Sequence, residues 1–159
     1  MSNDSPRYWF IPAGKGSSAQ QFFINSGCIA VDGTEMEDLA LWAHTREAMK
    51  SRTRIVFPDE SEKTIQQWAG QWFRFMNSVG RGDCVAFISE DRQQVYVGRV
   101  SGEYRFVPQL RSDFSHTRSV DWELPRSVND FSKIFTKRIK CQLLVSMRSL
   151  IAEVVTRTA

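Results

Sequence analysis

Short segments of alternating or continuous apolar residues recur along the chain, and this pattern predicts several strands. Residues 84–88 are almost continuously apolar, and 95–100 are rich in β-branched side chains. Residues 104–107 alternate in polarity, so they are expected to pair as the third strand of an antiparallel meander. Further strands are expected at residues 7–11, 28–31, 116–122 and 141–145.

A helical period is clearest between Ser61 and Ser78, where apolar residues recur three and four positions apart. Asp59, Glu60 and Glu62 surround its start, where the positive end of the helix dipole favours acidic groups. Shorter helices are expected at 19–24, capped by Ser17 or Ser18, at 35–41, at 45–50, capped by Thr45, and at 130–138. The predicted fold class is therefore α+β, with a small curled mixed β-sheet or barrel and flanking helices.

The chain length of 159 residues is typical of one domain. We expect a flexible tail at 1–6 and a folded domain at 7–147. Residues 148–159 are amphipathic, which predicts a final helix or a linker toward a further effector domain. The start of the chain is short and polar, and no apolar run is long enough to span a membrane, so a cytoplasmic protein is expected.

The net charge of +3 is modest, but the cations are unevenly distributed. Two groups of basic residues on a small domain favour a polyanionic partner, although such groups are often simply solvated. The first group is Arg46, Lys50, Arg52 and Arg54, and the second is Arg126, Lys133, Lys137, Arg138, Lys140 and Arg148.

Residues with catalytic or metal-binding chemistry are sparse. The three cysteines, Cys28, Cys84 and Cys141, lie in apolar runs and are expected to be buried reduced thiols. The two histidines, His44 and His116, are far apart in sequence and have no evident partner. No catalytic residues, metal site or cofactor are therefore predicted, and the domain is expected not to be an enzyme.

The loop 13–18 contains Lys15 between glycines, and it is followed by a predicted helix. A nucleotide-binding P-loop requires Ser or Thr after the lysine, whereas Gly16 stands there. The loop is therefore interpreted either as an ordinary strand-to-helix turn or as a contact for one phosphate of a nucleic acid.

An ordered set of short motifs runs through the chain. It consists of Trp9 with Ala13-Gly14-Lys15-Gly16, Ile29-Ala30-Val31-Asp32-Gly33 before Asp38-Leu39, Gln67-Trp68-Ala69-Gly70-Gln71 before Gly82-Asp83, Tyr96-Val97-Gly98-Arg99-Val100-Ser101-Gly102-Glu103-Tyr104, and Arg118-Ser119-Val120-Asp121-Trp122. Together these motifs resemble the N-terminal domain of Mrr-like, modification-dependent (type IV) restriction endonucleases. That domain belongs to the EVE branch of the PUA-like superfamily, which also contains the YTH readers of methylated RNA. The resemblance covers residues 7–147.

The resemblance implies a non-catalytic module that recognises a modified DNA base, such as methylcytosine, after flipping it out of the duplex. It places Asp32 and Gly33 at the base pocket, with Trp42, Trp68 and Tyr104 as stacking walls. Relatives often have Gly-Trp where Asp32-Gly33 stands, so either the pocket is altered in this chain or Trp42 or another ring supplies the wall. The expected phosphate contacts are Lys15, Arg99, Arg105 and Arg118.

Two other functions remain open from the sequence. The same fold reads modified RNA, and competition between DNA and RNA would separate these two partners. A sensor domain for a small molecule or a protein is the third possibility, and absence of DNA binding at low salt would favour it. The oligomeric state is not indicated by any motif.

Overall fold

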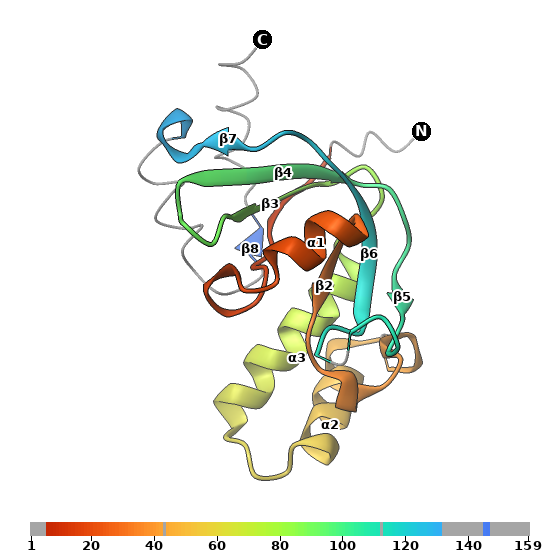
Figure 1. The fold of residues 1–159 in the computed structure, drawn as a ribbon. Coiled ribbons are helices and arrows are strands. Elements are labelled where there is room, and N and C mark those ends of the chain that lie inside the picture. The colour runs from red at the N-terminus through yellow and green to blue at the C-terminus, as the bar shows by residue number, and fades with distance from the viewer. Residues whose placement is uncertain (1–5, 43, 112, 132–144, 147–159) are drawn as a thin grey trace. The chain divides into compact units, whose positions relative to one another are not determined.

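In the computed structural model, residues 6–42, 44–111, 113–131 and 145–146 are described, and Figure 1 shows their arrangement. The described strands pair in the order β2-β6-β4-β3-β1-β8, with β5 beside β6 and β7 beside β4. Their bounds are β1 Tyr8–Phe10, β2 Cys28–Val31, β3 Cys84–Ile88, β4 Gln94–Val100, β5 Arg105–Phe106, β6 His116–Trp122, β7 Arg126–Ser127 and β8 Val145–Ser146.

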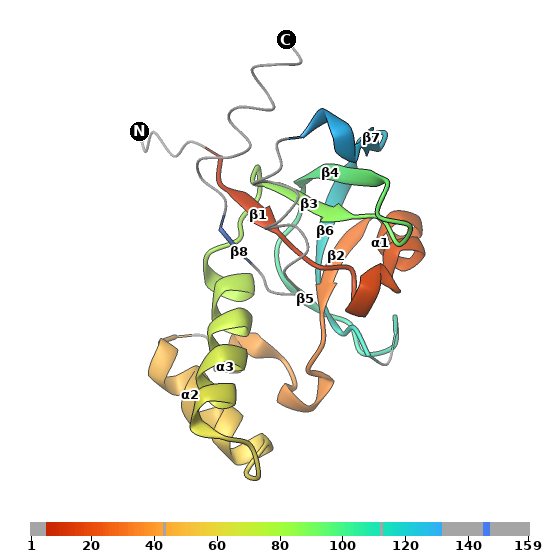
Figure 2. The ribbon, with the colours of Figure 1, turned by 90° about the vertical axis from the view of Figure 1, so that its left-hand side faces the viewer.

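The sheet is mixed. β1 runs parallel to β3, whereas the β3–β4, β4–β6 and β5–β6 pairs are antiparallel. Figure 2 shows β1 beside β3 from a second direction. The pairing path of the described strands ends at β2 and at β8, so this sheet is open and does not close into a barrel. The α+β class with a mixed sheet and flanking helices is therefore confirmed, and the barrel form of the prediction is not found.

The described residues fall into two compact units, and the chain passes between them more than once. The first unit takes its residues from Met1–Ile29, Arg81–Gly102 and Ser119–Ala159. The second takes Ala30–Gly80 and Glu103–Arg118. Each unit has its own hydrophobic cluster and is described by itself below.

The first unit packs apolar side chains from both of its parallel strands. Phe10 of β1 lies with Ala86 and Ile88 of β3, and Val95 and Phe131 complete the cluster. Burial of such side chains is the main favourable contribution to folding.

Gly98 allows β4 and β6 to approach closely within the first unit. A Cβ atom built on Gly98 would lie 2.5 Å from Val120 Cγ1 and 2.7 Å from Trp122 Cε3. A residue with a side chain would therefore not fit at this position, where the two strands approach each other closely.

Helix α1 (Gln20–Ser26) follows a short 3₁₀ turn, η1 (Lys15–Ser17). The expected serine cap is wrong. Ala19 occupies the N-cap position without a side-chain bond, and Ser17 instead donates its hydroxyl to the Ile88 carbonyl oxygen at 2.5 Å. The buried Ser17 therefore ties the glycine loop to the end of β3, where the Ile88 carbonyl would otherwise lack this donor.

The second unit contains the two longer helices, α2 (Arg46–Val56) and α3 (Glu62–Asn77), which lie side by side in Figures 1 and 2. A hydroxyl side chain caps each of them, and the cap by Thr45 was predicted. Thr45 accepts a bond from the Ala48 backbone N–H, and Ser61 accepts one from Thr64. The long helix and the Thr45 cap are confirmed, while α2 continues six residues past the predicted end at Lys50.

Two short 3₁₀ helices, η2 (Thr34–Met36) and η3 (Leu39–Leu41), replace the expected helix at 35–41. The core of the second unit contains Met36, Leu39, Met49, Ala69 and Trp72. These residues come from both 3₁₀ helices and from α2 and α3, so the short segments are fixed by the same packing as the long ones.

The expected meander is wrong in its third strand. β5 pairs with β6 through Arg105↔Thr117 and Phe106↔His116, and it does not pair with β4. The burial of Cys28 and Cys84 as free thiols is confirmed. The predictions for 1–5, 132–144, 147–159 and Cys141 lie outside the described residues. None of the helices in the described part is both long and apolar enough to cross a bilayer.

Candidate functional site

The turn Asp32–Gly33 follows directly after β2, and α3 fixes its position. Gly33 has φ +98°, a conformation that glycine adopts without a Cβ clash. A Cβ atom on Gly33 would lie 2.5 Å from Trp72 Cζ2, and Trp72 donates its indole N–H to the Asp32 carbonyl oxygen at 2.8 Å. The glycine is therefore required for the Trp72 ring to pack flat against this turn.

A buried hydrogen-bonded chain runs behind the same turn. His116 Nε2 lies 2.8 Å from the Gly33 carbonyl oxygen, and His116 Nδ1 lies 2.8 Å from the Tyr104 hydroxyl. Since a carbonyl oxygen only accepts, Nε2 must carry the proton, and neutral Nδ1 then accepts from Tyr104. The Tyr104 oxygen in turn accepts the Leu39 backbone N–H at 2.9 Å. Each polar atom of both side chains is thus satisfied.

Burial keeps both of these side chains neutral at physiological pH. Burial lowers the pKa of His116, although its bond to Gly33 and the nearby carboxylates of Asp38 and Glu35 act in the opposite direction. Burial likewise raises the pKa of Tyr104. These two neutral side chains, each bonded to its neighbours, hold the turn in place.

Asp32 differs from this network because its side chain is exposed. The dense protein around its carboxyl group raises its pKa, with a further increase from the negative charge of Glu35. The Asp32 carboxylate is therefore an exposed hydrogen-bond acceptor on a rigid turn.

The three predicted stacking walls all belong to the second unit and pack onto its core. Trp68 meets Phe57 edge to face at 5.2 Å between ring centroids, and it lies 6.3 Å from Trp72. Trp42 donates its indole N–H to the Met36 carbonyl oxygen. All five base-binding candidates are therefore brought into one unit.

Each of these walls has an existing partner. The Arg52 guanidinium covers the Trp42 ring, with Cζ 4.4 Å from the ring centroid. Tyr104 is half-buried and stacks on His116 at 6.0 Å. A base that stacks on the Arg52 face of Trp42 must therefore displace the guanidinium.

The predicted phosphate contacts are divided between the two units. Lys15 and Arg99 are exposed in the first unit, where Arg99 also donates to the Gly82 carbonyl oxygen at 2.9 Å. Arg105 is exposed on β5 of the second unit.

The prediction for Arg118 is wrong, because its side chain is only 3% exposed. Its guanidinium donates to the carbonyl oxygens of Phe75, at 3.0 Å, and Met76, at 2.7 Å. These carbonyls belong to the last turn of α3, which has no further helical N–H to bind them. Arg118 therefore caps α3 from β6, and its position inside the unit excludes it as an open phosphate contact.

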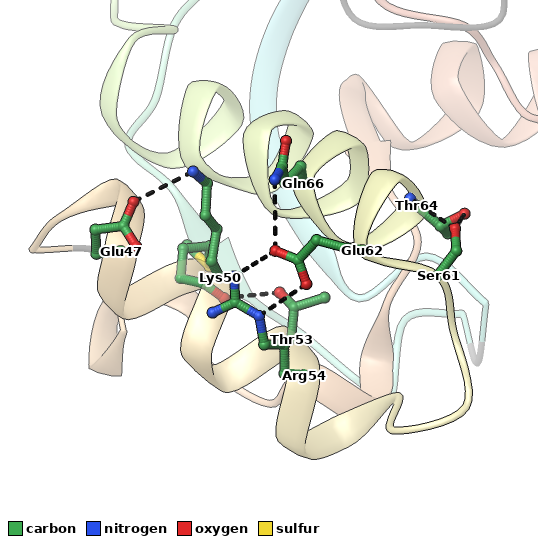
Figure 3. Close-up of polar contacts among 9 residues, drawn as sticks. Glu47, Lys50, Thr53, Arg54, Ser61, Glu62, Thr64 and Gln66 are labelled. Atoms are coloured by element: carbon green, nitrogen blue, oxygen red, sulfur yellow. Dashed lines mark hydrogen bonds and ion pairs between the residues drawn. The ribbon is translucent and has the colours of Figure 1, made fainter.

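Three cations of α2 have carboxylate partners, two of which Figure 3 shows. Lys50 pairs with Glu47 at 3.2 Å, and Arg54 pairs with Glu62 of α3 at 2.5 Å. Arg52 lies 3.8 Å from Glu37. The first predicted basic group is therefore largely neutralised within the unit, which weakens it as a general polyanion surface.

Sequence reasoning missed His116 and Trp72 as the residues that shape the turn. His116 was judged partnerless, whereas Tyr104 and Gly33 are its partners in space. The sequence did indicate that His116 is buried, because it lies two and four positions before Arg118 and Val120 on the same strand and therefore on the same face of the sheet. Trp72 was expected in the core, but its bond to the backbone of Asp32 had no sequence signal.

The described residues contain no group of three or more His, Cys, Asp or Glu side chains that could hold a metal ion.

Comparison with known proteins places the chain in a family. No curated protein and no solved structure matches the chain. The family described as "Domain of unknown function (DUF8426)" matches residues 9–148, which is most of the chain. The protein therefore belongs to the DUF8426 family.

Proposed function

We propose that this domain is a nucleic-acid-binding specificity module that recognises a modified, flipped-out DNA base. The module would serve a modification-dependent restriction system and would not itself cut DNA. We further propose that its mixed sheet is of the PUA-like type, which is what the resemblance of residues 7–147 implies.

The observation that carries the proposal is the Asp32–Gly33 turn. An exposed carboxylate stands on a backbone that Trp72 and His116 hold rigid. Rigid placement of a polar contact reduces the entropy lost on binding. Half-buried rings of the same unit, Trp42, Trp68 and Tyr104, supply aromatic surface of the kind that bases stack on.

The free energies of base flipping, stacking and methyl burial set the selectivity expected of such a reader. Flipping a base costs a few kcal/mol, and stacking on an aromatic ring returns about 1–3 kcal/mol. Burial of one added methyl group contributes about 0.8 kcal/mol, which corresponds to about a fourfold preference over the unmodified base. The expected discrimination is therefore modest for methylcytosine.

The test is fluorescence anisotropy with matched short duplexes that contain cytosine, 5-methylcytosine or 5-hydroxymethylcytosine, at two salt concentrations. A preference for a modified duplex that persists at the higher salt supports the proposal. Equal and steeply salt-dependent binding to all three duplexes contradicts it. An RNA competitor is included in the same assay, and stronger binding to RNA would assign the module to RNA.

Variants locate the contact. Asp32→Asn removes the charged acceptor for the exocyclic amine, which all three bases carry, so it is expected to weaken binding to every duplex. Trp68→Ala is likewise expected to weaken binding to every duplex. Asp59→Asn is the matched control, because Asp59 is an exposed acid on the loop between α2 and α3. Native affinity of Asp32→Asn for all three duplexes would exclude this turn as the base contact.

A further inference from the structure

Arg46 and Arg74 are distinguished from the other cations of their two helices by what surrounds them. Arg46 is the first residue of α2 and lies over the Phe73 ring of α3, with its Cζ 4.9 Å from the ring centroid. Arg74 follows Phe73 on α3, and its Nη1 lies close above Gly70, 3.5 Å from where a Cβ would be. Both arginines belong to the second unit.

Arg74 is incompletely satisfied. Its Nε is shielded from solvent and has no hydrogen-bond partner among the described residues. Burial lowers the pKa of Arg74, and the positive charge of Arg46 lowers it further. The charged group that shifts the pKa of Arg74 is thus another cation and not a carboxylate.

The neighbouring cations show the contrast. Lys50, Arg52 and Arg54 each have a carboxylate within 4 Å, and Figure 3 shows the Lys50–Glu47 and Arg54–Glu62 pairs. Arg52 Nε also lacks a hydrogen-bond partner in the described part of the chain, but Glu37 lies opposite its guanidinium. Arg46 and Arg74 have no such ion pair there.

We infer that Arg46 and Arg74 form a binding site for a phosphoryl group on the face shared by α2 and α3. Two guanidinium groups present several N–H donors to the oxygens of a phosphate and compensate its charge. The first turn of α2, which Arg46 begins, adds the positive end of the helix dipole. A bound anion would remove the repulsion between the two arginines.

The phosphoryl group can come from a polynucleotide backbone or from a free phosphate compound. The first source rests on the proposed function, whereas the second does not. The test therefore uses two probes in parallel: inorganic pyrophosphate, and a short single-stranded DNA oligonucleotide.

The first measurement is thermal unfolding at increasing pyrophosphate concentration, with chloride at equal ionic strength as the reference. A ligand that binds only the folded state raises its stability with concentration. We expect this rise for the native protein, and at least about a tenfold weaker response for Arg46→Gln and for Arg74→Gln. Arg54→Gln, a charge-matched change at a paired cation of α2, is expected to keep the native response.

Stability without ligand separates a binding role from a structural one. Removal of one member of a repelling pair is expected to leave the melting temperature unchanged or higher. A marked destabilisation by Arg74→Gln would assign Arg74 a structural role and overturn the inference.

The oligonucleotide assay separates the two sources. If both variants weaken binding of DNA and of pyrophosphate, the site contacts a polynucleotide backbone. If pyrophosphate binding alone is lost, the site takes a free phosphoryl compound, and the proposed DNA function needs other contacts. Unchanged binding of both probes in both variants overturns the inference. This holds even if the duplex assay shows a preference for a modified base, because that preference tests the proposed function and not this site.

Discussion

Single residues at the Asp32–Gly33 turn are restricted by their neighbours more than by their own chemistry. Gly33 leaves room for the Trp72 ring, His116 binds its carbonyl oxygen, and Tyr104 fixes the tautomer of that histidine. None of these three contacts could be predicted from residue type alone, because each joins residues from different elements. The turn itself was predictable, since Asp-Gly is a strong turn signal.

The clearest residue-scale prediction concerns Gly33→Ala. A positive φ costs a non-glycine residue about 1–2 kcal/mol, and the clash with Trp72 adds about 1–3 kcal/mol. Gly82→Ala is the matched control, because Gly82 has φ +89° with no atom within 4 Å of the added Cβ. Urea unfolding is expected to show a larger loss for Gly33→Ala. Equal losses would mean that Trp72 moves aside without cost.

His116 predicts a pH dependence of stability. Its pKa in the folded protein is below the ordinary value of 6.5, so the unfolded chain takes up the proton first as the pH falls. Stability is therefore expected to decrease below about pH 6.5, by at most about 1.4 kcal/mol per pH unit, and to level off only below the folded pKa. Above about pH 6.5 this contribution is fully present.

The measurement is the free energy of unfolding of the native protein minus that of His116→Gln, from pH 5 to 8 in ~0.5 unit steps. The difference is expected to shrink as the pH falls below about 6.5. His44→Gln, which changes the exposed histidine, serves as the control. A difference that stays constant with pH would show that His116 is not held neutral by the fold.

Helices and strands lie where the sequence predicted them if one hydrophobic period extended over the whole element. The α3 helix and the strands β2, β3 and β6 lie where polarity predicted them, because burial of one face requires that spacing. The short elements did not. The two residues of β5 pair with β6, and α1 begins without a serine cap. In both cases a contact with a distant segment replaces the local interaction that the sequence predicted.

Arg118 shows how an element end can be completed by a distant residue. Its sequence position resembled a phosphate contact, but its guanidinium binds the last carbonyls of α3. We predict that Arg118→Met destabilises the protein by about 1.5–3 kcal/mol, the range for hydrogen bonds to a charged group. Arg105→Met, on the adjacent β5, is expected to change stability by less than about 0.5 kcal/mol.

Chemical denaturation of both variants tests this prediction. Under conditions where Arg118→Met remains folded, its affinity for DNA is expected to equal that of the native protein. A folded Arg118→Met with native stability but weaker DNA binding would restore the original interpretation of Arg118 as a phosphate contact.

At the scale of the whole molecule, the net charge is +3, but few of the basic side chains of α2 are available to bind a polyanion. Ion pairs occupy Lys50, Arg52 and Arg54, while Arg46 and Arg74 have none among the described residues. The sequence shows how many charges there are, but their pairing depends on the α2–α3 packing. The charged surface was therefore the least predictable part of the candidate site.

This pairing predicts a shallow salt dependence of duplex binding. Each neutralised phosphate contributes about −0.9 to the slope of log K against log salt, so contacts by Lys15, Arg99 and Arg105 give a slope near −3. Arg105→Gln is expected to reduce its magnitude by about 1, and Arg54→Gln to leave it unchanged. A titration series between ~50 and ~200 mM salt measures the slope. A change on Arg54→Gln as large as that on Arg105→Gln would contradict this account.

The buried chain from Leu39 through Tyr104 and His116 to Gly33 also has a consequence for synthesis on the ribosome. The two ends of the His116–Gly33 bond are 83 positions apart, and Leu39 and Tyr104 are 65 apart. A nascent chain therefore exposes the Asp32–Gly33 turn well before the residues that secure it have been translated. The turn reaches its final form only after β6 emerges, so a chain that stops before Tyr104 lacks the contacts that fix the turn.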